Sequence, residues 1–291
     1  MKAEHIQRHF MSGAGNLFTV IDNRIYNLTL QELQKMSKQL CSLSNGETVD
    51  GLIAMKNHPD YVFEAEYINP DGSAGSMCGN GSRCAVLFAV QHFLRIEDSI
   101  PLYGSFDFMM ANRMYHTEFS ESGKLVRVHF PVITDIDPHR MIEVGNNTYI
   151  CSYVFNGSDH CIIDASRIGL DYTSFFLFDL AQFAPALRYH SAFGDRGANI
   201  TIALEQDSTI YIRTYERGVE AETGACGTGA MATAIIFHTL YNMTYPITII
   251  PTSKEILTIG SYETDHHIYL EGPAIFLDEQ DIVHNIKSIK P

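Results

Sequence analysis

The sequence has a deficit of basic residues and no long uninterrupted apolar run. Its 291 residues include 20 Lys and Arg against 34 Asp and Glu, which gives a formal net charge of −14. This balance argues against nucleic acid or an anionic membrane surface as a partner, because both are bound by basic patches. The most apolar stretch, residues 230–250, is interrupted by His238, Asn242 and Pro246, which argues against a membrane span. The N-terminus MKAEHIQRHF has no apolar segment behind its charges, so we predict no secretory signal and a cytoplasmic protein.

Cysteine is also sparse, and its spacing suggests no metal site. The six cysteines stand at positions 41, 78, 84, 151, 161 and 226. In a chain of this length without an export signal, we expect free thiols rather than disulfides. The spacing Cys78-x5-Cys84 fits no common zinc finger and HExxH is absent, so we predict no metal. The two cysteine motifs described below contain no lysine for a pyridoxal Schiff base, so we also predict no cofactor.

The remaining composition and the residue patterning indicate an ordinary globular α/β (α+β) protein. The apolar fraction is 45% and the charged fraction 19%, which are usual values, and the length favours two domains. Residues 28–41 have the pattern of an amphipathic helix with Thr29 as its N-cap. Alternation with period two predicts strands at residues 17–22, 61–68, 125–130, 209–216 and 267–272.

One short pattern occurs twice, about half a chain length apart. Cys78-Gly-Asn-Gly and Cys226-Gly-Thr-Gly each follow a predicted strand and a glycine-containing link of nine residues. Each precedes an apolar segment, residues 82–95 or 229–241, that is predicted to be a helix. A helix that is apolar on every face is buried. The repeat therefore indicates an internal duplication in which each half wraps strands around a central helix, with one cysteine at the entrance to that helix.

The start of a helix gives a cysteine a defined chemistry. The first turn offers unpaired backbone N–H groups and the positive end of the helix dipole, which favour a thiolate. A carboxylate placed on Gly79–Asn80 and Gly227–Thr228 would be held by the same groups. A racemase needs a base on one face of a carbon and an acid on the other, which two cysteines can supply. The helix N-termini would stabilise the carbanion next to the carboxylate without a cofactor.

A structural interpretation of each cysteine stands beside the catalytic one. A single cysteine in a glycine turn before a helix is usually structural, and only the second copy at matched spacing favours a functional role. Four cysteines lack this context and are predicted to be small core residues: Cys41, Cys84, Cys151 and Cys161.

Three segments of the chain resemble the signature sequences of the cofactor-independent diaminopimelate epimerases. They are SGAGNLFTVID at 12–22, NPDGSAGSMCGNGSRCA at 69–85 and YERGVEAETGACGTGAMA at 215–232. The resemblance implies two pseudo-symmetric, barrel-like halves with the active site between them. It implies interconversion of LL- and meso-diaminopimelate, in the synthesis of lysine and peptidoglycan precursors. The expected halves are residues 1–130, completed by a C-terminal strand at 278–291, and residues 131–277. A homodimer and a small amino-acid substrate are also implied.

The resemblance also assigns roles to individual residues. Cys78 and Cys226 match the acid/base pair, and Gly79, Asn80, Gly227 and Thr228 match the cradle of the reacting carboxylate. His160 and Glu216 match groups that tune the cysteine pKa values. The implied substrate-binding side chains are those of Asn16, Asn69, Ser158, Asn199, Glu216 and Arg217. Of these, Glu216 would pair an ammonium group, and Arg217 is suited to a distal carboxylate.

Without the resemblance, several of these residues have ordinary explanations. Glu216 and Arg217 could be an exposed ion pair at a strand end, and Asn16 and Asn69 next to glycines could be turn residues. Asn199 has no signal of its own, and His160 alone would more often be a buried, hydrogen-bonded histidine.

The chain departs from the family at residues 157–160. The family commonly has Gly-Asn-Pro-His where this chain has Gly-Ser-Asp-His. Ser158 is shorter than asparagine, so we expect a water to fill the gap. Asp159 adds negative charge, which raises the pKa of a nearby thiol or histidine.

Two alternatives to a diaminopimelate epimerase therefore stay open. The first is the same fold and chemistry acting on another amino acid, such as glutamate, histidine or lanthionine. The second is a redox or ligand-binding protein in which Cys78 and Cys226 form a switchable disulfide.

Overall fold

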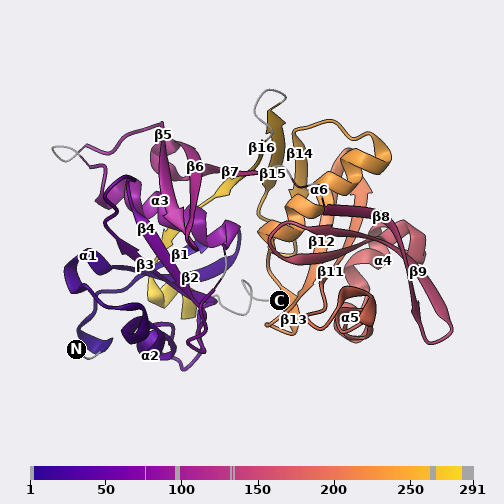
Figure 1. Ribbon diagram of the computed structural model, residues 1–291, viewed down its shortest axis with the longest axis horizontal. Helices are drawn as coiled ribbons and strands as arrows, with labels where there is room; N and C mark the ends of the chain where they lie inside the picture. Colours follow the sequence, from indigo (N-terminus) through magenta and orange to yellow (C-terminus); the bar gives the residue numbers. More distant parts are fainter. Residues whose placement is uncertain are drawn as a thin grey trace. The chain divides into compact units, whose positions relative to one another are not determined.

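The computed structural model describes residues 3–75, 77–95, 99–131, 133, 135–262 and 267–283. Its chain divides into two compact units (Figure 1). Among the described residues, unit 1 contains those up to Phe130 and those from Glu271 onward, and unit 2 contains residues 131–270. Each unit mixes strands with a few helices, as the sequence predicts. No helix of the described residues is long and apolar enough to span a membrane.

Unit 1 is a sheet that contains two parallel crossovers. Strand β2 is antiparallel to β1 and parallel to β3, and β4 is antiparallel to β3 and parallel to β5. Strands β5, β6 and β7 then follow as antiparallel neighbours, and β17 pairs with β1 on its other side. The elements are β1 (His9–Gly13), β2 (Asn16–Asp22), α1 (Asn23–Tyr26), α2 (Leu30–Leu40), β3 (Gly51–Lys56), β4 (Glu64–Ile68), α3 (Gly79–His92), β5 (Gly104–Met110), β6 (Arg113–Ser120), β7 (Leu125–Pro131) and β17 (Ile275–Leu277).

Unit 2 repeats this order of pairings. Strand β10 is antiparallel to β9 and parallel to β11, and β12 is antiparallel to β11 and parallel to β14. Strand β15 is antiparallel to β14, and β8 pairs with β9 as β17 does with β1. The elements are β8 (Asp135–Val144), β9 (Asn147–Phe155), β10 (Asp159–Asp164), α4 (Tyr172–Leu177), α5 (Leu180–Arg188), β11 (Asn199–Gln206), β12 (Thr209–Glu216), β13 (Ala221–Thr223), α6 (Gly227–Tyr241), β14 (Ile247–Ile250), β15 (Leu257–Tyr262) and β16 (His267–Pro273). The matching order confirms the predicted duplication.

Each unit has one central helix in its second crossover. Helix α3 connects β4 to β5 and packs on β1, β2 and β3. Helix α6, orange in Figure 1, connects β13 to β14 and packs on strands of unit 2 that include β10 and β11. Residues 79–90 of α3 are all buried, as are residues 229–237 of α6. This agrees with the apolar pattern that predicted both helices to be buried.

The first crossover of each unit carries outer helices that close a second core. In unit 1, α2 begins at the predicted N-cap Thr29, where Thr29 and Glu32 form a capping box. Leu33 and Leu40 of this helix are buried in a core shared with β2 and β3. In unit 2, α4 and α5 occupy the same place and bury Phe175 and Leu187. Helices α4 and α5 are not predicted from the sequence pattern, because both are short and α5 contains Pro185.

Several element and unit boundaries differ from expectation. Helices α3 and α6 begin directly after their cysteines rather than at residues 82 and 229, because glycine is tolerated in a first turn that a side-chain cap stabilises. Strand β4 begins at Glu64 rather than at 61. The chain returns to unit 1 at Glu271, within β16, rather than at 278. Residues 279–283 are helical where a strand was expected, and 284–291 lie outside the described residues.

Candidate active site

Cys78 is the N-cap of α3 in unit 1. Its backbone is extended, with φ −113° and ψ 112°, and its Sγ accepts a hydrogen bond from the Gly81 N–H at 3.3 Å. The Cys78 carbonyl accepts the N–H of Ser82 at 2.8 Å, which starts the helix. A thiolate in this position is stabilised by a backbone donor and by the helix dipole.

Cys226 has the same position at the start of α6 in unit 2. Its backbone has φ −118° and ψ 104°, and its Sγ accepts the N–H of Gly229 at 3.4 Å. A Cβ at Gly229 would lie 3.2 Å from this Sγ, so the third residue after the cysteine must be small. The N–H groups of Gly227 and Thr228 have no acceptor within the helix, as in any first turn. Unpaired N–H groups at a helix start are suited to binding a carboxylate.

Asn16 and Asn80 lie together in unit 1. The turn between β1 and β2 uses left-handed backbone at Ala14 (φ 54°) and Gly15 (φ 90°), and Asn16 follows it. Its Oδ1 accepts the side-chain N–H of Asn80 at 2.5 Å. A Cβ at Gly13 would lie 2.4 Å from the Asn80 carbonyl oxygen, so only glycine lets β1 approach the start of α3 this closely.

Arg83 supports this arrangement from within the helix. Its side chain is fully buried, and it donates to the Oδ1 of Asn80 at 2.7 Å and to the Gly79 carbonyl at 3.0 Å. It also reaches the Pro273 carbonyl at 3.3 Å, 190 residues away in the chain. Arg83 was not among the predicted site residues, although it stands inside the first cysteine signature.

Asn69 lies in the turn that follows β4. Its backbone N–H and side-chain Nδ2 bond to Ser73, at 3.0 Å to the carbonyl and 2.9 Å to the hydroxyl. These bonds are those of a turn residue, which was the interpretation from spacing alone.

In unit 2 the structure brings Ser158, Asn199 and Arg217 together. Asn199 is the first residue of β11, and its Nδ2 donates to the Ser158 hydroxyl at 2.9 Å and to the Asp159 carbonyl at 3.0 Å. Its Oδ1 accepts the backbone N–H of Arg217 at 2.8 Å. The Arg217 guanidinium reaches the Ser158 hydroxyl at 3.3 Å. Ser158 therefore contacts both partners directly.

Asp159 is the central anion of this cluster. Its Oδ2 accepts the Nη1 of Arg217 at 2.7 Å and lies 3.4 Å from the Nη2 of Arg196. Its Oδ1 accepts the hydroxyl of Tyr153 at 2.9 Å. Burial and this hydrogen bond raise the pKa of Tyr153 to about 12, so the tyrosine is a neutral donor.

His160 is fully buried on β10, beside Asn199 of β11. Neither of its ring nitrogens has a hydrogen-bond partner among the described residues. Burial, followed by the positive charge of Arg217, lowers the pKa of His160 to about 3. Asp159 does raise it, as expected, but its effect is smaller than that of burial. Near pH 7 the imidazole is therefore neutral.

Glu216 ends β12, next to Arg217 and half-buried. Its Oε1 accepts the hydroxyl of Thr223 on β13 at 2.5 Å. Asn156, a residue without a sequence signal, donates to the Thr228 carbonyl at 2.7 Å and fixes the first turn of α6. Cys226 Sγ lies 3.6 Å from the Thr228 hydroxyl.

The other four cysteines are buried thiols in the cores, as expected. Burial raises the pKa of Cys41 to about 12 and also raises that of Cys84. Contact with Cys151, together with burial, raises the pKa of Cys161. The raised pKa values keep Cys41, Cys84 and Cys161 protonated near neutral pH, so these three cannot serve as thiolate bases.

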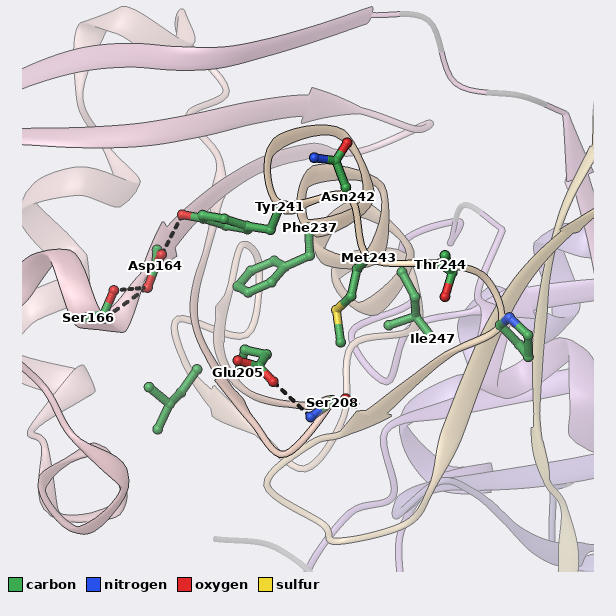
Figure 2. Close-up of a pocket in the computed structure, with 12 residues that line it drawn as sticks. Asp164, Ser166, Glu205, Ser208, Phe237, Tyr241, Asn242, Met243, Thr244 and Ile247 are labelled. Atoms are coloured by element: carbon green, nitrogen blue, oxygen red, sulfur yellow. Dashed lines mark hydrogen bonds between the residues drawn. The ribbon is translucent and has the colours of Figure 1, made fainter.

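A cavity of about 680 Å³ also lies in unit 2 (Figure 2). Phe237, Tyr241 and the C-cap Asn242 line it, and the hydroxyl of Tyr241 donates to Asp164 at 2.5 Å. These residues belong to the C-terminal part of α6, whereas Cys226 caps its N-terminus. At 1.5 Å per residue, the two ends are about 20 Å apart. None of the predicted site residues lines this cavity.

The fold is shared with solved structures of low sequence identity. A hydroxyproline epimerase from Agrobacterium vitis has a TM-score of 0.66 and 11% identity, covering 94% of this chain and 91% of that chain. A phenazine biosynthesis protein of the PhzF family from Bacillus anthracis has a TM-score of 0.66 and 10% identity, covering 93% and 96%. The fold and the repeated cysteine N-cap thus define a two-unit protein of the fold class that these structures share.

Sequence comparison gives the family. The diaminopimelate epimerase family model matches residues 9–101 and 154–277. A diaminopimelate epimerase from Chlorobaculum tepidum is 34% identical over 268 residues, which are 91% of this chain and 96% of that protein. One from Aquifex aeolicus is 31% identical over 273 residues, 90% and 92% of the two chains. The chain belongs to the diaminopimelate epimerase family.

Proposed function

We propose that this protein is an isomerase that interconverts LL- and meso-diaminopimelate by proton transfer at Cys78 and Cys226, without a cofactor. The observation that carries the proposal is the repeated cysteine N-cap, with nearly equal backbone angles and the same Sγ acceptor geometry in both units. The family relationship supports the choice of substrate.

The reaction needs one cysteine as thiolate and the other as thiol. The thiolate removes the α-hydrogen as a proton and becomes a thiol, and the electron pair stays on the substrate as a carbanion delocalised into its carboxylate. The other thiol then gives its proton to the opposite face of the carbon and becomes a thiolate. The backbone N–H groups at the starts of α3 and α6 would stabilise the negative charge on the carboxylate.

The remaining residues fit roles in substrate binding. We propose that Arg217 binds the distal carboxylate, since its Nε–H has no acceptor among the described residues and guanidinium is suited to carboxylates. Glu216 and His160 are proposed to tune the pKa values of the two cysteines, and His160 would do so as a neutral imidazole. A homodimer and a cytoplasmic location are further proposals from the family resemblance, as is a role in lysine and peptidoglycan precursor synthesis.

Hydrogen exchange at the substrate α-carbon tests the proposal. Reduced enzyme is mixed with LL-diaminopimelate in D2O, without pyridoxal phosphate or metal, and deuterium uptake and configuration are followed by NMR. Deuterium incorporation with inversion is expected. An enzyme that exchanges no α-hydrogen of diaminopimelate would contradict the proposal.

A second candidate is a racemase of the same fold for another amino acid. The observation that favours it is the hydrogen bond from the Arg217 guanidinium to Asp159. Asp159 lies in a segment where the family commonly has other residues, and its carboxylate uses part of the guanidinium that would bind the substrate. Faster exchange with glutamate or histidine than with diaminopimelate would establish this candidate.

A further inference from the structure

Asp159 and Arg217 form an ion pair inside the proposed substrate site. The Asp159 side chain is only 5% exposed, and that of Arg217 is 25% exposed. Both oxygens of Asp159 are bonded, one to Tyr153 and one to Arg217. The carboxylate is therefore a fixed negative charge, held by neighbours rather than by solvent.

Arg217 nevertheless keeps donors for a ligand. Its Nη1 is used by Asp159 and by the Gly197 carbonyl, and one Nη2 hydrogen by the Ser158 hydroxyl. The Nε–H and a second Nη2 hydrogen have no acceptor among the described residues. Nε and Nη2 form the side of a guanidinium that can bind a carboxylate with two parallel bonds. A substrate carboxylate bound there would share Arg217 with Asp159.

If Asp159 and a substrate carboxylate both bind Arg217, two negative charges lie close together. Carboxylates on two sides of one guanidinium, each at about 2.9 Å from its donor, lie on the order of 7 Å apart. Arg196 offsets part of the repulsion, although its side chain is 69% exposed and screened by water. The neutral His160 adds no positive charge.

We infer that Asp159 is a specificity-determining residue, which favours substrates whose distal end carries an ammonium group beside its carboxylate over those whose distal end is a carboxylate alone. An ammonium on the same carbon gains from Asp159 about what the carboxylate loses, because both lie at similar distances from the buried charge. A distal carboxylate without an ammonium group is repelled by Asp159 and gains no compensating attraction. This inference rests on the proposed function and on Arg217 as the distal anchor.

The test uses two ligands that differ only in the distal ammonium, LL-diaminopimelate and L-2-aminopimelate. Calorimetry gives their dissociation constants for the wild-type protein and for Asp159→Asn, which keeps shape and removes charge. In the variant, 2-aminopimelate should bind roughly tenfold more tightly, while diaminopimelate changes by less than about threefold. The ratio of the two constants is the measured quantity.

Tyr153→Phe is the matched control. It removes the other hydrogen bond of Asp159 but keeps the charge, so the ratio should stay within about twofold of the wild-type value. A ratio that moves equally in both variants would show a structural effect and overturn the inference. So would equal changes for both ligands in Asp159→Asn, or a wild-type protein that binds neither ligand. Failure of the proposed function has a different signature, namely binding of diaminopimelate without α-hydrogen exchange.

Discussion

The two units have the same cysteine N-cap at the start of their central helices, with different side chains around it. At Cys78 and Cys226 the backbone angles agree within 8°, and each Sγ accepts the N–H three residues on. Five residues after each cysteine, unit 1 has the buried Arg83 and unit 2 the buried Met231. Duplication has thus preserved what positions the thiol, while the charge beside it has diverged.

The difference shows how two equal thiols can be made unequal. Arg83 places a buried guanidinium on the carbonyl of Gly79, the residue that follows Cys78, and a nearby cation favours the thiolate over the thiol. Unit 2 instead fixes its first turn through the neutral side chain of Asn156. In a reaction that needs one base and one acid, such asymmetry biases which of the two cysteines is the thiolate in the free enzyme.

Removing either thiol gives the largest expected effect. Cys78→Ala and Cys226→Ala should each lower the rate of epimerisation by roughly 10²–10⁴-fold, because each removes a positioned acid or base. The NMR assay in D2O measures this. Cys151→Ala is the control, a core thiol in unit 2 that should leave the rate within about threefold. Equal losses of rate in all three variants would contradict an acid/base role that is specific to the N-cap cysteines.

Exchanging the divergent residue should give the next largest effect. Arg83→Met places the residue of unit 2 into unit 1, and kcat should fall about 10- to 100-fold because hydrogen bonds from a buried cation are lost. The acid limb of the kcat profile should move to higher pH, since the Cys78 thiolate loses a neighbouring cation. Met231→Leu is the matched control and should change kcat less than about threefold. An unmoved acid limb would contradict the electrostatic role of Arg83.

The buried His160 should make the stability of unit 2 depend on pH in acid, and unit 1 has no histidine at the matching position. His160 pairs in register with the first residue of β11, where unit 1 has Phe18 opposite the first residue of β3. Because the folded pKa of about 3 lies below the ordinary histidine pKa of 6.5, unfolding takes up a proton between these limits. Stability from the neutral histidine is complete above pH 6.5 and is lost as the pH falls towards 3. Urea midpoints measured against pH should fall less steeply over this range for His160→Leu than for wild type. Parallel curves would show that His160 takes up no proton on unfolding.

The smallest effect is expected at an outer helix of unit 1. Thr29→Ala removes the side-chain cap of α2 and should lower the free energy of unfolding by about 1 kcal/mol, with kcat unchanged. Thr29→Ser retains the hydroxyl and should recover most of the loss. Chemical denaturation measures both, and a kcat that fell with Thr29→Ala would link α2 to the reaction.

Local patterns in the sequence were sufficient for the duplicated motif, both central helices and the Thr29 cap. Each depends on residues within one turn or one strand, where propensity and capping act directly. Elements that lack a strong local pattern were not predicted correctly. Helices α4 and α5 are short and lack strong periodicity, and residues 279–283 follow a strand whose place depends on pairing with β1.

What the sequence by itself determined is therefore the family, the fold class and the two cysteines at their helix starts. Only the tertiary structure decided the surroundings of the thiols and of Arg217. Arg83 meets Pro273 across 190 residues, and Asp159 meets Arg217 across 58. Such pairs leave no local signal, because they arise only when strands distant in the chain pack around a common core.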